Sequence, residues 1–375
     1  MKRLLIPLLS LVFILSCSFT PPDTLPVETD PPAATAPLAA TNPPAPTKVP
    51  ATTPVPPVIT LPPSGAQPLP PVLAGCPIFP PDNIWNARVD WLPLDPRSGD
   101  YIASIGAEDI FHMDFGSGEW DGGPIGIPYN LVDASQVGST VEFYYPEESD
   151  PGPYPIPPDP LIEGGPDADG DRHILILDTD ACILYELYDA WPPENAGDPW
   201  SAGSGAIYDL ASNALRPAGW TSADAAGLPI LPGLVRYDEV LSGRITHALR
   251  FTAPYTRSDY IWPARHFASE DDNPNLPPMG QRFRLRSNYD ISGFDPFLQV
   301  ILRAMKEYGI ILADNGSSWY VSGVPDERWD NDLLHELDVL VGADFEAVDA
   351  SSLMIEPDSG ACRQPNTVYL PSIIR

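Results

Sequence analysis

The sequence has few basic residues for its length. Its 375 residues include 51 Asp and Glu but only 20 Lys and Arg, so the formal net charge is −31. Nucleic acids and anionic membrane surfaces attract proteins through Lys and Arg, so this balance argues against both as partners. It also argues against a polyanionic substrate, whereas neutral polymers, cationic groups and Ca²⁺ stay compatible with it. Solubility outside the cell accounts for the same charge without any ligand.

Several catalytic sequence motifs are absent. The chain has neither a GxGxxG motif nor a P-loop, so nucleotide chemistry is not indicated. It has no G-x-S-x-G motif, which serine hydrolases use to present their nucleophile. It also has no H-x-H or H-E-x-x-H pair that would place two zinc ligands side by side.

The apolar run at residues 4–15 is too short to cross a bilayer, which requires ~20 residues in a helix. Because Lys2 and Arg3 precede it, the run is typical of a secretory signal. It ends in ILSC at 14–17, which resembles the lipobox of bacterial lipoproteins. The resemblance implies that residues 1–16 are removed and that Cys17 carries the lipid. An ordinary cleaved signal is the alternative.

The segment 18–75 is nearly all Pro, Thr, Ala and Val, and 18 of the 50 prolines lie in it. Proline prevents regular helices and central strands, and too few large apolar residues remain to form a core. We therefore expect a disordered Pro/Thr-rich linker after the lipidated Cys17. Together, these segments predict an exported protein that is held at the membrane surface only by its lipid.

The composition changes near Cys76, and about 270 residues follow without a second linker or an internal repeat. We expect one globular domain over 76–348 and a separate tail over 349–375. Apolar runs between Gly, Pro, Asn and Asp predict strands, and the expected strands are 139–145, 173–178, 182–191, 205–210, 245–251, 260–268, 281–287, 309–314 and 318–323. Helical spacing favours a helix over 294–309, a weaker one over 326–340 and a short one over 98–106. This pattern predicts a mainly β fold, a single β-sandwich or barrel-like domain with one or two helices.

Cys76, Cys182 and Cys362 remain once Cys17 is set aside. An exported protein favours disulfides, so one bond is expected, and all three pairings are open. Cys76 and Cys362 flank the domain, and chain termini often lie close together. We therefore prefer the Cys76–Cys362 pairing.

Two groups of residues suggest metal sites. Asp167, Asp169 and Asp171 have the spacing of a calcium loop, although the turn glycine is misplaced, and an exposed acidic turn is the alternative. We therefore expect no cofactor other than a possible calcium at these acids. His173 lies in a strand-like segment, as do His247 and His266, so the three could converge on a zinc ion. Buried, hydrogen-bonded histidines are the alternative.

Acidic residues beside aromatic ones favour a carbohydrate-active site. A pair of carboxyl groups can cleave glycosidic bonds, and aromatic faces stack on sugar rings. Glu186, Asp114 and Asp224 are the candidate catalytic residues, and Glu186 has a buried structural acid as its alternative role. The candidate substrate-binding residues are Trp120, Trp191, Arg265 and Asp314.

Segments such as CPIFPPDNIWN, GDRHILILD, RPAGWTSADAAGLPILPGLVRYDE and YGIILADNGSSWYVSG resemble a group of secreted bacterial proteins. The resemblance covers nearly all of 76–348 and implies a single domain, but no catalytic residue follows from it. The ending VYLPSIIR resembles the tails of many exported proteins of filamentous green phototrophic bacteria. We expect a surface lipoprotein that acts on an extracellular glycan as a glycoside hydrolase or lyase. A non-catalytic carbohydrate-binding or adhesion module and a metal-dependent hydrolase are the alternatives.

Overall fold

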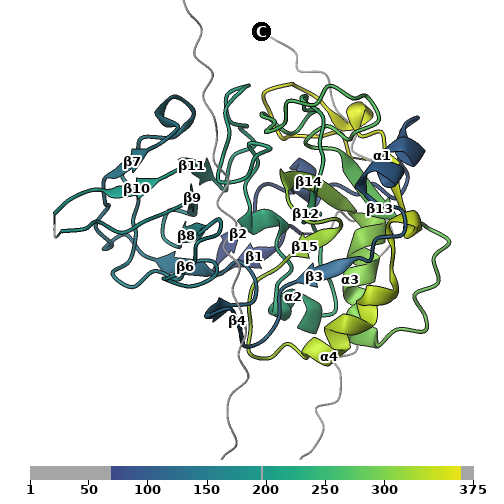
Figure 1. Ribbon diagram of the computed structural model, residues 1–375, viewed down its shortest axis with the longest axis horizontal. Helices are drawn as coiled ribbons and strands as arrows, with labels where there is room; N and C mark the ends of the chain where they lie inside the picture. Colours follow the sequence, from purple (N-terminus) through teal and green to yellow (C-terminus); the bar gives the residue numbers. More distant parts are fainter. Residues whose placement is uncertain (1–68, 196, 365–375) are drawn as a thin grey trace, which may run out of the picture. The chain divides into compact units, whose positions relative to one another are not determined.

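The computed structural model describes residues 69–195 and 197–364 (Figure 1). The predicted signal, Cys17, most of the linker and the end of the tail lie outside these residues. Strands exceed helices in the described part, so the prediction of a mainly β fold is confirmed. None of the sheets formed by these residues closes into a barrel. No helix in the same part is both long and apolar enough to span a membrane.

The larger sheet has six strands in the order β16-β13-β14-β12-β15-β3. Its strands β12 and β14 are parallel, as are β15 and its edge neighbour β3, whereas the remaining pairs are antiparallel. The edge strand β3 matters for function because it ends on an acidic residue, Asp114. The strands are β3 (His112–Asp114), β12 (Leu249–Ala253), β13 (Arg282–Leu285), β14 (Ile310–Asn315), β15 (Tyr320–Ser322) and β16 (Phe345–Val348).

The second sheet has four strands in the order β11-β9-β8-β6, namely β11 (Ser204–Asp209), β9 (Ile183–Tyr188), β8 (Ile174–Asp178) and β6 (Tyr129–Val132). Both of its faces are covered. Leu175 and Leu184 belong to the main core, which also contains residues of the six-stranded sheet. Ile174 and Leu187 point the other way, into a smaller core. Side chains alternate along a strand, so the uninterrupted apolar runs predicted here supply both cores.

Smaller elements complete the described part. The short strands are β1 (Val72–Leu73), β2 (Cys76–Pro77), β4 (Glu119–Trp120), β5 (Gly123–Pro124), β7 (Val141–Phe143) and β10 (Trp200–Ala202). The α-helices are α1 (Ser98–Ile105), α2 (Tyr237–Leu241), α3 (Pro296–Glu307) and α4 (Asn331–Leu334). The 3₁₀-helices are η1 (Ile84–Asn86), η2 (Pro146–Glu148), η3 (Leu231–Gly233), η4 (His335–Val339), η5 (Gly342–Asp344) and η6 (Ser351–Leu353). The expected helix over 294–309 is α3, and the Asp295 side chain caps it by accepting from the Phe297 amide at 2.8 Å.

Two of the expected boundaries are wrong. Residues 260–268 do not form a strand, because Pro263 lacks an N–H and only Tyr260 makes a bridge, to Met279. The domain also continues beyond 348. Leu353 and Cys362 are fully buried, so residues up to at least 362 belong to its core.

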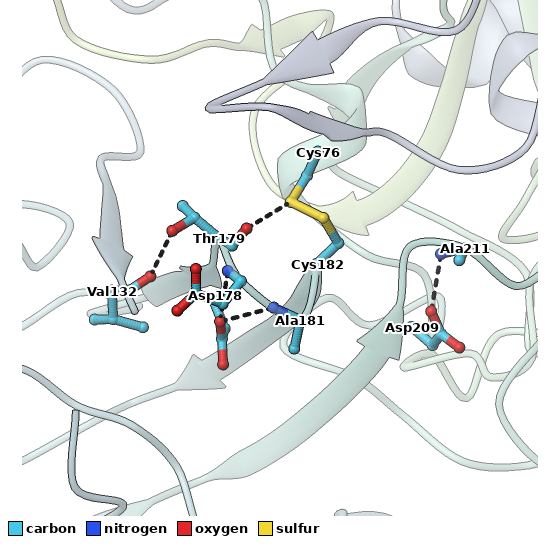
Figure 2. The surroundings of a disulfide bond; sticks show 9 residues. Cys76, Val132, Asp178, Thr179, Ala181, Cys182, Asp209 and Ala211 are labelled. Atoms are coloured by element: carbon cyan, nitrogen blue, oxygen red, sulfur yellow. Dashed lines mark hydrogen bonds between the residues drawn. A yellow bond between two sulfur atoms is a disulfide. The ribbon is translucent and has the colours of Figure 1, made fainter. Parts of the chain in front are cut away.

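The predicted Cys76–Cys362 disulfide is also wrong. Cys76 is bonded to Cys182, with the Cα atoms 5.4 Å apart (Figure 2). Cys182 follows the turn between β8 and β9, where the Asp178 carboxylate accepts from the amides of Asp180 and Ala181. The bond therefore ties β2 to the four-stranded sheet. The Cys362 thiol, in contrast, lies in the core 3.1 Å from the Asp82 carbonyl oxygen.

Candidate functional site

A cavity of about 550 Å³ lies against the edge strand β3 of the six-stranded sheet. Asp114 and Glu163 both line it, together with Trp120, His112 and Tyr320. It is large enough for a small ligand, since such sites span ~300–1,000 Å³. It combines two of the sequence-predicted residues, Asp114 and Trp120, with an acid that the sequence analysis did not single out.

Strand pairing and loop packing bring the two acids into this cavity. Asp114 is the last residue of β3 and lies opposite Ser322 in the register with β15. The loop that follows Asp114 contains the β4–β5 hairpin, and there Gly123 packs against the backbone of Gly164. A Cβ atom at Gly123 would overlap the Gly164 carbonyl group, so only glycine permits this approach. The close approach places Glu163 beside the loop that carries Asp114.

Glu163 is held by a buried histidine. The Glu163 amide donates to the His173 carbonyl at 3.0 Å, and His173 Nδ1 donates to Glu163 Oε2 at 2.5 Å. His173 Nε2 faces the Ala223 carbonyl at 2.9 Å. A carbonyl oxygen can only accept and a carboxylate also accepts, so both ring nitrogens carry protons and His173 is an imidazolium.

Glu163 and His173 each stabilise the charged form of the other. Burial disfavours the charged forms of both groups, but the Glu163 carboxylate raises the pKa of His173 to about 10. In the same way, burial alone would raise the pKa of Glu163, but the charge and hydrogen bond of His173 lower it. Glu163 therefore stays ionised at neutral pH.

Asp114 is shifted in the opposite direction. The surrounding cavity wall desolvates its carboxyl group and raises its pKa, although His112 partly offsets this, and the charge of Glu163 raises it further. One cavity therefore contains two carboxyl groups whose pKa values are shifted in opposite directions, that of Asp114 upward and that of Glu163 downward. In many hydrolytic enzymes, such a difference between the pKa values of two carboxyl groups determines which one acts as the acid and which as the base.

Aromatic rings border the same cavity. The Trp120 side chain, at the tip of the β4–β5 hairpin, is 79 % exposed. His112 and Tyr320 lie side by side on β3 and β15 with ring centroids 4.3 Å apart. Exposed rings around a polar pocket are suited to stacking on the apolar face of a sugar.

A second cavity, of about 390 Å³, is lined by two further predicted residues, Asp224 and Asp314. Asp224 is fully buried and accepts two bonds from Arg250, at 2.5 and 2.7 Å. Asp314 lies 3.4 Å from the same guanidinium and is hydrogen-bonded to Asp224. Burial, together with the charge of Asp224, raises the pKa of Asp314 well above its usual value. Asp224 is therefore neutralised by Arg250 rather than available to a substrate.

The two cavities meet at one place. Glu163 lines the first cavity and Asp171 lines the second. Their carboxylate oxygens and a ring nitrogen of His173 all lie within 4.8 Å of one another. Glu163 of the first cavity and Asp171 of the second are thus close neighbours.

The predicted catalytic role of Glu186 is wrong. Its side chain is fully buried in the core, and it lines neither cavity. It accepts from the amides of Ile230 and Leu231 at 2.9–3.0 Å, at the start of η3. Burial raises the pKa of Glu186 to about 7, although these two amides oppose the shift. A carboxyl group in this position cannot touch a substrate, and it holds the 230–231 backbone against β9.

The predicted roles of Trp191 and Arg265 also do not match their positions. Trp191 lines neither cavity, and the Arg172 guanidinium lies 3.7 Å from its ring centroid and so covers one face. Arg265 is buried and donates to the carbonyls of Arg216 and Pro357, both at 2.7 Å, so its role is to join loops. Neither side chain is placed to contact a ligand in these cavities.

The proposed metal ligands do not gather as expected. Among the described residues, the group that could hold a metal is Glu163, Asp171 and His173, which includes neither Asp167 nor Asp169. Both ring nitrogens of His173 already have partners, the Glu163 carboxylate and the Ala223 carbonyl. His247 contacts Arg236 and Glu239, whereas His266 faces the Ala225 carbonyl. Among the described residues, the three histidines do not form a group that could hold a metal. Calcium binding near Asp171 stays a prediction.

Glu163 and His173 were missed as a pair because no local pattern marks them. They lie ten residues apart on either side of an acidic Gly- and Pro-containing loop. Only the folded loop makes them neighbours. No family model matches this sequence, and neither a curated protein nor a solved structure matches it significantly, so the candidate site rests on its own geometry.

Proposed function

We propose that this protein is a glycoside hydrolase that acts on an extracellular polysaccharide in the 550 Å³ cavity. The observation that carries the proposal is the pair Asp114 and Glu163, which line one cavity and whose pKa values are shifted in opposite directions. The exposed ring of Trp120 in the same wall supplies a surface for a sugar. The low content of basic residues supports a neutral or cationic polymer over an acidic one.

In this proposal Asp114 is the general acid and Glu163 is the general base. Asp114 gives its proton to the glycosidic oxygen as the bond between that oxygen and the anomeric carbon breaks. Glu163 takes a proton from a water molecule, whose oxygen forms the new bond to the anomeric carbon. His173 keeps Glu163 ionised and fixes its orientation through the 2.5 Å bond to Oε2, which leaves Oε1 for the water.

The test is the release of reducing ends from a panel of neutral and amine-containing polysaccharides. Asp114→Asn and Glu163→Gln should each lower the rate by about 10²-fold or more, the usual contribution of a general acid or base. Glu119→Gln is the matched control, because Glu119 precedes Trp120 but lines neither cavity. Wild-type activity in both variants, with their fold intact by circular dichroism, would overturn the assignment.

The expected pH profile of the activity follows from the pKa shifts of Asp114 and Glu163. Activity should fall at low pH as Glu163 becomes protonated, and fall again as the pH rises through the raised pKa of Asp114, because the acid must carry its proton. A profile without an alkaline limb would contradict the role of Asp114.

A non-catalytic carbohydrate-binding module is the second candidate, and the exposure of Trp120 favours it. The same panel separates the two functions. Glycan binding that is lost in Trp120→Ala, without any release of reducing ends from the wild-type protein, would support the binding module.

A further inference from the structure

The second cavity has aromatic walls that the proposed hydrolysis does not use. Tyr145 and Tyr188 line it on the side of the four-stranded sheet, and His266 lines it from the loop after residue 260. The Tyr145 ring is 47 % exposed, so it is open to a ligand.

A row of stacked rings leads away from this cavity. The rings of His266 and Phe267 are 12° from parallel with centroids 5.8 Å apart, and Tyr260 continues the row at 6.4 Å from Phe267. Phe267 is 37 % exposed. Exposure of part of an apolar ring to solvent does not stabilise the fold. Such a row forms an extended apolar surface, here called the ledge, on which a sugar ring can stack.

The charged side chains that line this cavity are mainly acidic. Glu148, Asp171, Asp224 and Asp314 line it, and its lining contains neither Lys nor Arg. Arg250 neutralises Asp224 from behind and reaches Asp314. Asp171 is exposed, and in the described ranges no Lys or Arg pairs with it, although its carboxylate lies within 4.8 Å of a ring nitrogen of His173. An acidic sugar would be repelled here, whereas an ammonium group would gain charge-assisted hydrogen bonds.

We propose that the second cavity binds a sugar unit that carries a protonated amine, so that the substrate is a polysaccharide containing unacetylated hexosamine. The ring of that unit stacks on the ledge formed by His266 and Phe267, and its amine faces Asp171. Because Asp171 and Glu163 lie within 4.8 Å, this unit is next to the one whose bond is cleaved. This inference rests on the proposed function, because it takes the ligand to be part of the polymer that is cleaved in the first cavity.

The test is calorimetric titration of the full chain with short glucosamine oligosaccharides and with their fully N-acetylated counterparts, at mildly acidic pH. The amine form should bind more tightly, and Asp171→Asn should weaken its binding by roughly threefold to fivefold, the effect of one exposed charge pair. Phe267→Ala should weaken both forms. Asp169→Asn and Tyr255→Ala are matched controls, since both residues are exposed and line neither cavity.

The outcomes separate this inference from the proposed hydrolysis. Asp114→Asn should lower cleavage by about 10²-fold or more and keep the preference for the amine form over the N-acetylated form. Equal affinity for the two oligosaccharides, or an unchanged preference in Asp171→Asn, would overturn the amine site. Amine-dependent binding without any release of reducing ends would support the amine site and count against the hydrolase.

Discussion

At the scale of single residues, three acids in this protein differ through their surroundings alone. Glu163 is ionised because a buried imidazolium contacts it, whereas desolvation by the cavity wall raises the pKa of Asp114. Glu186 accepts from two backbone amides, and in the described ranges no cation is paired with it, so burial dominates its pKa. The identity of the residue therefore says little about its role, and the partner within hydrogen-bond distance decides it.

Glu186 gives a prediction for stability. Its pKa is raised in the folded state, so the protonated form is favoured by folding, and stability is lost as the pH rises from the unfolded pKa of 4.5 through about 7. Glu186→Gln removes this titration. Across that range, its free energy of unfolding should rise relative to wild type by up to about 3 kcal/mol.

Urea unfolding at a series of pH values measures this difference, with Glu119→Gln as an exposed control. Parallel curves for wild type and Glu186→Gln would show that the Glu186 carboxyl titrates normally in the folded protein.

At the scale of elements, periodicity located the strands that form the cores. The runs at 173–178 and 182–191 became β8 and β9, which pair antiparallel through a turn capped by Asp178. The expected strand at 260–268 does not form, because an apolar composition cannot replace the backbone N–H that Pro263 lacks. The edge strand β3 was not predicted, because three residues are too few to show a period of two.

The disulfide gives a prediction for how these elements are held together. Cys76 and Cys182 are 106 residues apart, so their bond closes a long loop in the unfolded chain. Replacing both by Ala should lower the free energy of unfolding by about 4–5 kcal/mol on the chain-entropy model. Chemical unfolding without reductant measures the loss, and wild type in reductant should show a similar decrease.

Two results would contradict the Cys76–Cys182 pairing. One is a double variant as stable as wild type without reductant. The other is a mass-spectrometric disulfide map that joins Cys362 to either cysteine.

At the scale of the whole molecule, we propose that the globular domain is held at the cell surface by a lipid on Cys17. The motif ILSC and the proline-rich segment that follows support this proposal, and the motif lies outside the described residues. In the producing cell, Cys17→Ser should move the protein from the membrane fraction to the medium or leave its signal uncleaved. Fractionation followed by immunoblotting tests it, and unchanged membrane association would contradict the lipid anchor.

The sequence by itself determined the mainly β class, the helix α3 and the candidate acid Asp114, because alternation, capping and an acid in a Gly-rich loop are local patterns. Only the tertiary structure decided that Glu186 is a core residue, that Cys76 pairs with Cys182, and that Glu163 joins Asp114. These features depend on segments far apart in the chain. Burial and ionic partners are set by what packs against a side chain, and no spacing along the sequence records that.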